Sequence, residues 1–188
     1  MYMKKVFTIL ILSLLLYQPV MSQQPPMNKV ITTTPHQQLT AGLALPLANF
    51  GETHYGGITF SYLRKQERFN NREPYQRKKT GWLAAASLSH YLGKKEKNGM
   101  IAYRYKGYSL LELSAGGAWY PDNNLDFSLR AGPALGYYNK IFRFTLSSIL
   151  QGSYKIGPKT VITPGLTLLK ETGSDAIWVT SIQLGIMF

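Results

Sequence analysis

Apolar residues recur at every second position over most of this 188-residue chain. Between residues 124 and 138 they alternate with small or polar residues, and residues 140–155 repeat the pattern. A side-chain period of two is the geometry of a β-strand whose two faces meet different surroundings. The sequence shows no helical periodicity of useful length and no repeat beyond the strand rhythm. It therefore predicts an all-β protein built from two-faced strands.

Several segments carry this pattern and are separated by turn residues such as Gly, Pro, Asn and Asp. They span residues 37–46, 54–64, 80–92, 108–120, 124–138, 140–155, 160–170 and 177–188. Pro133 and Pro164 lie inside two of these segments. A proline removes a hydrogen-bond donor from the ladder between strands. We therefore expect each of these two strands to break or to carry a bulge at its proline.

The N-terminus has the layout of a secretory signal peptide. Lys4 and Lys5 form a positively charged region, and a mostly apolar stretch follows from Val6 to Val20. This stretch is short for a membrane span of ~20 residues and is interrupted near its end. The sequence therefore predicts export, with cleavage before Gln23.

The composition of the polar strand faces separates a membrane barrel from a soluble one. A soluble, lipocalin-like barrel also alternates, but its polar face meets water and is rich in Lys and Glu. Here that face is mostly Gly, Ser, Thr and Ala, and charged residues make up only 16% of the chain. Small residues fit the crowded interior of a narrow barrel, whereas Leu, Phe and Ile on the other face fit lipid. Aromatic residues near strand ends fit the interfacial girdles of such barrels: Trp119, Tyr120, Tyr137, Tyr154 and Trp178.

An exported chain without a second long apolar helix crosses a membrane only as a closed barrel, because lipid cannot satisfy an open sheet edge. The fold class predicted is therefore an all-β, closed, antiparallel up-and-down transmembrane β-barrel of about eight strands. The expected organisation is a signal peptide at 1–22, a periplasmic N-terminal tail at 23–36 and the barrel at 37–188.

Four charged residues fall on the predicted inward face of consecutive strands. They are Glu112, Asp126, Arg130 and Arg143. Neighbouring strands lie ~4.8 Å apart, so these residues are expected to form one ionic cluster inside the barrel. The cluster is either a gate that plugs the lumen or a structural network that neutralises buried charge, and the two roles are compatible. A barrel of this width is not expected to conduct solutes.

Two further groups of basic residues lie outside the clearest strands, in a chain with a formal net charge of +12. The first, a basic interaction segment, comprises Arg64, Lys65, Arg68, Arg72, Arg77, Lys78 and Lys79. The second, an outer-loop group, comprises Lys94, Lys95, Lys97, Arg104 and Lys106. On an exported protein, such groups are expected to meet lipopolysaccharide phosphates, anionic lipid or a partner protein, and not nucleic acid. A merely solvated loop is the alternative for the first segment.

Residues for catalysis or metal binding are sparse. Ser89 and His90 are adjacent, but neighbouring residues in a strand point to opposite faces and cannot act together directly. No carboxylate is placed to orient His90 as a catalytic triad requires. The remaining histidines, His36 and His54, are scattered, and the chain has no cysteine. We therefore expect no enzymatic activity, no metal site and no cofactor.

The last predicted strand carries a specific pattern of outward residues: Trp178, Ile182, Leu184, Ile186 and the terminal Phe188. With the strand rhythm over 37–188, this pattern resembles the small eight-stranded outer-membrane β-barrels of Gram-negative bacteria, the outer-membrane protein A and X group. The resemblance implies an outer-membrane location, insertion by the barrel-assembly machinery and periplasmic termini. It would place 65–79 on the periplasmic side and 93–107 outside. The Ser22-Gln23 junction resembles those of exported Bacteroidota proteins.

The function expected from these features is structural or interactive. The barrel would support envelope integrity, or bind lipopolysaccharide or a partner protein through its basic loops. Two alternatives stay open. One is a component of an envelope-spanning secretion or conjugal-transfer apparatus, similar to TraO-type proteins. The other is a lipid-modifying enzyme or narrow channel of the outer membrane.

Overall fold

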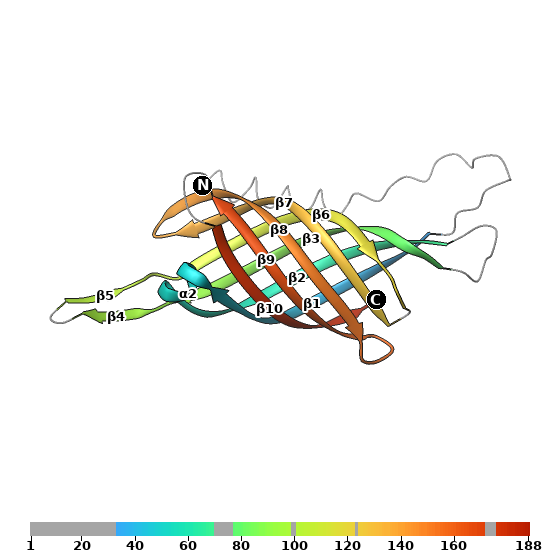
Figure 1. The fold of residues 1–188 in the computed structure, drawn as a ribbon, viewed down its shortest axis with the longest axis horizontal. Helices are drawn as coiled ribbons and strands as arrows, with labels where there is room; N and C mark the ends of the chain where they lie inside the picture. The colour runs from blue at the N-terminus through green and yellow to red at the C-terminus, as the bar shows by residue number, and fades with distance from the viewer. Residues whose placement is uncertain (1–32, 70–76, 99–100, 123, 172–175) are drawn as a thin grey trace, which may run out of the picture. The chain divides into compact units, whose positions relative to one another are not determined.

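A computed structural model describes residues 33–188, except for 70–76, 99–100, 123 and 172–175. Eight antiparallel strands close into a barrel in the order β1-β10-β9-β8-β7-β6-β3-β2 (Figure 1). Their bounds are β1 Thr33–Leu47, β2 His54–Phe69, β3 Arg77–Gly93, β6 Tyr108–Trp119, β7 Leu125–Tyr138, β8 Ile141–Lys155, β9 Thr160–Glu171 and β10 Ala176–Met187. The predicted fold class is confirmed. The predicted signal peptide lies outside the described residues.

Several strands are longer than the sequence predicts. β1 begins at Thr33, inside the segment expected to be a tail. β2 ends at Phe69 and β3 begins at Arg77, so both strands reach into the basic segment. Three further elements lie at one end of the barrel. They are a short helix α2, Ala48–Thr53, and a separate two-stranded hairpin of β4, Lys95–Asn98, and β5, Ile101–Arg104, which projects beyond the barrel (Figure 1).

Large apolar side chains cover the outside of the barrel, whereas the inside combines many polar side chains with buried Leu, Val and Ala. On neighbouring positions of β7, Ser128 is 2% exposed and Leu129 is 63% exposed. On β8, Thr145 is 1% exposed while Phe144 is 63% exposed. An apolar wall of this size is incompatible with water and matches the lipid-facing surface of a transmembrane barrel.

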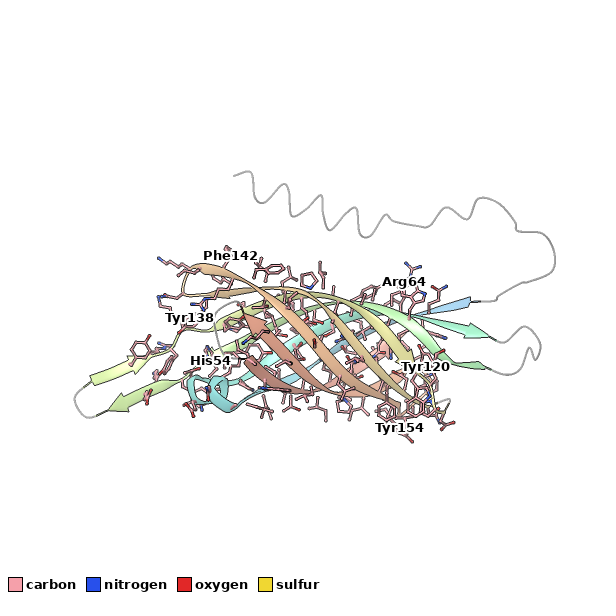
Figure 2. All side chains as sticks on the ribbon, turned by 45° about the horizontal axis from the view of Figure 1, so that its top comes forward. His54, Arg64, Tyr120, Tyr138, Phe142 and Tyr154 are labelled. Atoms are coloured by element: carbon pink, nitrogen blue, oxygen red, sulfur yellow. The ribbon has the colours of Figure 1, made fainter. Side chains whose placement is uncertain are left out.

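The height of the apolar wall suits a membrane. On β8, the outward residues run from Phe142 at one end to Tyr154 at the other (Figure 2). Twelve steps of ~3.3 Å at a strand tilt of ~40° give a height of roughly 30 Å. Trp119 and Tyr154 are exposed toward one end and Tyr137 and Trp178 toward the other, as expected for two girdles. Tyr120 is an exception to the expected girdle, because it is buried inside the barrel and only 4% exposed.

The two internal prolines neither break their strands nor create a bulge. Beside Pro133 the β6–β7 ladder skips from Glu112↔Ala134 to Ala115↔Ala131, with the same register on both sides. Beside Pro164 the β8–β9 ladder skips in the same way, from Gln151↔Gly165 to Tyr154↔Ile162. Each proline therefore leaves a local gap in pairing on one side. Its strand stays paired on the other side, with Pro133 opposite Leu146 and Pro164 opposite Ile182.

Candidate functional site

The two ends of the barrel differ in what they carry. At the terminal end, β1 begins beside the C-terminus, where Gln37 and Phe188 exchange two backbone hydrogen bonds of 3.1 and 3.0 Å. The connection between β2 and β3 lies at this same end. The opposite end, named the hairpin end, carries α2, the β4–β5 hairpin and the tight turn at Asn139 and Lys140, both in the left-handed region with φ of 48° and 68°. Figure 2 shows Tyr120 and Tyr154 at the terminal end and His54 and Tyr138 at the hairpin end.

An ion pair fills the lumen toward the terminal end. Lys65 on β2 donates to both carboxylate oxygens of Asp126 on β7, at 2.8 and 3.0 Å, and to Ser153 Oγ on β8 at 3.2 Å. Lys65 is 4% exposed and Asp126 is 9% exposed. The sequence placed Lys65 in a loop, but β2 is longer than predicted. Lys65 continues the inward row of Ser61 and Leu63.

A second pair of charges lies deeper in the barrel. Glu112 on β6 and Arg130 on β7 are 4% and 3% exposed and line the same interior cavity of about 20 Å³. Ser, Thr and Gln side chains form much of the rest of its wall. The Lys, Arg, Asp and Glu side chains buried in the described lumen are thus Lys65, Arg130, Glu112 and Asp126, whose formal charges sum to zero. Balance of this kind is required of charges withdrawn from water.

The structure does not place Arg143 in this lumen group. Arg143 follows the inward phase of Thr145, as predicted, but it is exposed near the hairpin end of β8. Ile149 is the strand partner of Arg130, and Arg143 lies six residues farther along β8. That offset is ~20 Å along the strand. The residue alternation predicted the face correctly, but it carried no information on the height of each charge in the barrel.

Helix α2 fills the mouth of the barrel at the hairpin end. Phe50 is 8% exposed and packs against the rings of His54, Tyr91 and Tyr108, with centroid distances of 4.4, 5.2 and 5.5 Å. Tyr138 extends this aromatic cluster, 5.9 Å from His54. The sequence carries no local signal of this cluster, because its members are far apart in the chain.

Hydrogen bonds tie α2 to the base of the hairpin. Thr53 Oγ1 lies 2.8 Å from His54 Nδ1, and His54 Nε2 lies 3.1 Å from the carbonyl oxygen of Lys106. Lys94 donates through Nζ to the carbonyl of Gly51, and its backbone N–H donates to Thr53 at 2.9 Å. Lys94, predicted as an outer-loop cation, therefore has a structural role at the mouth.

The β4–β5 hairpin presents the other outer-loop cations. Lys95, Arg104 and Lys106 are exposed, while the side chain of Lys97 lies outside the described residues. Tyr105 donates its hydroxyl to Glu96 at 3.1 Å, and its ring meets Tyr103 edge-on at 4.8 Å. The hydrogen bond to Glu96 raises the pKa of the Tyr105 phenol above its ordinary value. These contacts stiffen the base of a basic projection.

The basic segment over 64–79 is only partly described. Arg64 is partly exposed near the terminal end (Figure 2), and Lys65 belongs to the lumen. Arg72 lies outside the described residues, as do the side chains of Arg68, Arg77, Lys78 and Lys79. Its role in binding a partner stays a prediction.

Ser89 and His90 point to opposite faces, as expected. Ser89 is inward and donates to Thr59 at 2.9 Å, whereas His90 faces outward and its Nδ1 lies 2.9 Å from Ser109 Oγ on β6. Neither contact includes a carboxylate. Among the residues that the structure describes, no three His, Cys, Asp or Glu side chains gather as a metal site would require.

The C-terminal pattern lies on the lipid-facing wall of β10. Its five members are all exposed: Trp178, Ile182, Leu184, Ile186 and Phe188. Recognition of these residues by the assembly machinery stays a prediction.

Comparison with known structures identifies the fold. Ail, the attachment invasion locus protein of Yersinia pestis, superposes with a TM-score of 0.55 at 12% identity, covering 81% of this chain and 98% of Ail. Ail in a phospholipid bilayer nanodisc gives 0.52 at 13% identity, covering 82% of this chain and 100% of Ail. The chain therefore has the fold of a small outer-membrane β-barrel. No protein-family model and no curated protein matches the sequence.

In the part of the chain that the structure describes, no helix is both long and apolar enough to span a membrane.

Proposed function

We propose that this outer-membrane barrel is a non-enzymatic interaction protein that binds phosphate-bearing envelope glycolipid, the chemistry of lipopolysaccharide, through its basic hairpin. The observation that carries the proposal is the grouping of exposed Lys95, Arg104 and Lys106 on and beside a hairpin that projects from one end. Exposed cations attract phosphates at the membrane surface, where anionic headgroups concentrate. Ail, which shares the fold, has been crystallised with the polyanion sucrose octasulfate, a heparin analogue.

The proposal includes a closed lumen. The ion pair of Lys65 and Asp126, the charges of Glu112 and Arg130, and the aromatic mouth around Phe50 lie at successive levels of a barrel whose described interior cavity holds about 20 Å³. That volume suits about one water molecule and leaves no room for solute flow. We therefore expect no steady conductance from the intact protein in planar bilayers.

The proposal also includes the orientation and kinship suggested by the sequence. The outward residues of β10 support insertion by the barrel-assembly machinery, with both termini periplasmic and the hairpin outside. Kinship with the A/X-like barrels of Bacteroidota is part of the same proposal. The extended β2–β3 connection would then face the periplasm, where its basic residues are available to an envelope partner.

Charge reversal tests the binding role. Lys95→Glu, Arg104→Glu and Lys106→Glu should each weaken binding of lipopolysaccharide to the reconstituted barrel, and added salt should weaken the wild type as well. Lys159→Glu is the matched control, because Lys159 is exposed at the terminal end. Unchanged binding in all three hairpin variants would refute the role of the hairpin.

A further inference from the structure

The outer wall near the hairpin end has a recess at two glycines of β2. Gly56 and Gly57 lie at a register shift between β2 and β3, and the neighbouring positions on β1 and β3 carry large apolar side chains. The result is a groove of about 330 Å³ lined by Leu43, Leu45 and Leu92 and floored by the glycines. Leucines exposed on adjacent strands make the recess lipid-facing.

A second groove of about 770 Å³ begins where the first ends, because His90 and Leu92 line both. Arg104 and Lys106 contribute two exposed cations to it, and Ser109 adds a hydroxyl in contact with His90. None of the described residues that line either groove is acidic. The cavity wall therefore changes from apolar to cationic along its length.

The change occurs at the level of the membrane interface. His90 and Ser109 are strand partners, and Ser109 is in turn the partner of the exposed Tyr137. Tyr55, also exposed, lines the cationic groove. Exposed tyrosines at a strand end are typical of the headgroup level, so the apolar groove lies beside acyl chains and the cationic groove beside phosphates.

We propose that the two grooves form one binding site for a single phosphate-bearing membrane lipid, with an acyl chain against Gly56 and a phosphate beside Arg104, Lys106 and His90. This inference rests on the proposed glycolipid-binding function. It locates that binding on the barrel wall at the base of the hairpin. Guanidinium and ammonium groups bind phosphate by charge-assisted hydrogen bonds, and the recess selects a lipid over a free phosphate. A lipid is favoured over a protein segment because the apolar groove opens toward the bilayer.

Native mass spectrometry of the mature barrel released from nanodiscs tests the site. The nanodiscs contain phosphatidylcholine doped with lipid A in one arm and with phosphatidylglycerol in the other. The wild type should retain one anionic lipid per barrel, and the arm with greater retention identifies its class. Gly56→Leu should lower retention at least tenfold by filling the recess. The added Cβ meets the flexible Leu45 side chain at 3.2 Å and makes an ordinary contact with the Ala44 carbonyl oxygen at 3.5 Å, so the barrel should still fold. Arg104→Glu with Lys106→Glu should lower it similarly.

The control for the recess is Gly117→Leu, because Gly117 is an exposed glycine on β6 with no atom closer than 4.0 Å to an added Cβ. The control for the charges is Lys159→Glu, because Lys159 is exposed at the terminal end and lines neither groove. If the wild type retains lipid and Gly56→Leu retains as much, the groove site is wrong while glycolipid binding by the hairpin stands. If the wild type retains none, both proposals are wrong. A mass of two barrels without lipid would overturn the site in favour of a second copy.

Discussion

The buried ion pair of Lys65 and Asp126 gives the sharpest test of how the lumen is stabilised. Asp126→Asn keeps the shape of the side chain but removes the negative charge that lies 2.8 and 3.0 Å from Lys65 Nζ. Lys65 is 4% exposed and would then hold its charge with only a neutral amide and Ser153 as partners. Breaking a buried pair by removing one partner costs about 3–5 kcal/mol. Because the amide oxygen and Ser153 still accept hydrogen bonds, we expect a loss of about 3 kcal/mol.

Equilibrium unfolding by urea in lipid vesicles measures this loss, with the three tryptophans as fluorescent reporters. The paired replacement of Lys65→Met with Asp126→Leu removes both charges and leaves apolar side chains in their place. Such replacements are neutral or stabilising in other proteins. The free energy of unfolding of the double variant should therefore lie within about 1 kcal/mol of the wild-type value or exceed it. The comparison separates the cost of an unpaired charge from the value of the pair.

Two outcomes would refute the reasoning. A loss below about 1 kcal/mol in Asp126→Asn would mean that water or another anion reaches Lys65, contrary to its burial. A double variant as unstable as the single one would mean that packing in this layer, and not charge balance, sets the stability.

Two further predictions concern packing. Phe50→Ala should lower the free energy of unfolding of the barrel by about 3 kcal/mol, because it leaves a cavity in the aromatic mouth. The variant should still not conduct in planar bilayers, because the polar layer deeper in the lumen remains filled. A steady current through the variant would mean that the aromatic mouth alone closes the lumen. Gly116→Ala should prevent the compact, heat-modifiable form on gels, because an added Cβ would clash with the backbone carbonyl oxygen of Leu129. Gly117→Ala, on the outer face of the same strand, should migrate like the wild type.

The alternation of residues predicted the strands and their faces but not their register. Ser128 and Leu129 fall on the faces expected of them, since the phase of a strand is a local property of its sequence. The height of each residue depends on which residues pair across strands, and that is not local. The sequence pattern therefore places Arg143 beside Arg130 and leaves Lys65 out of the lumen. Lys65 shares the inward phase of Leu63, and extending the predicted strand by one inward position would have found it.

The mouth and the groove could not be predicted for a related reason. Phe50 meets Tyr91 and Tyr108 from a helix of six residues, which is too short to show a helical period. His90 and Ser109 come together only through the β3–β6 register. The Gly56-Gly57 pair was visible in the sequence, but its meaning depends on the leucines of the neighbouring strands.

The distribution of charge connects the lumen to the binding proposals. The four acidic and basic side chains buried in the described lumen sum to zero, and the wall that faces lipid is predominantly apolar. The formal charge of +12 must therefore reside mainly at the ends of the barrel and in the N-terminal part of the chain. Each interior charge must be offset by one of opposite sign for the barrel to be stable, because burial removes its hydration. The end charges are under no such constraint, and their excess of one sign produces a field suited to anions at the membrane surface.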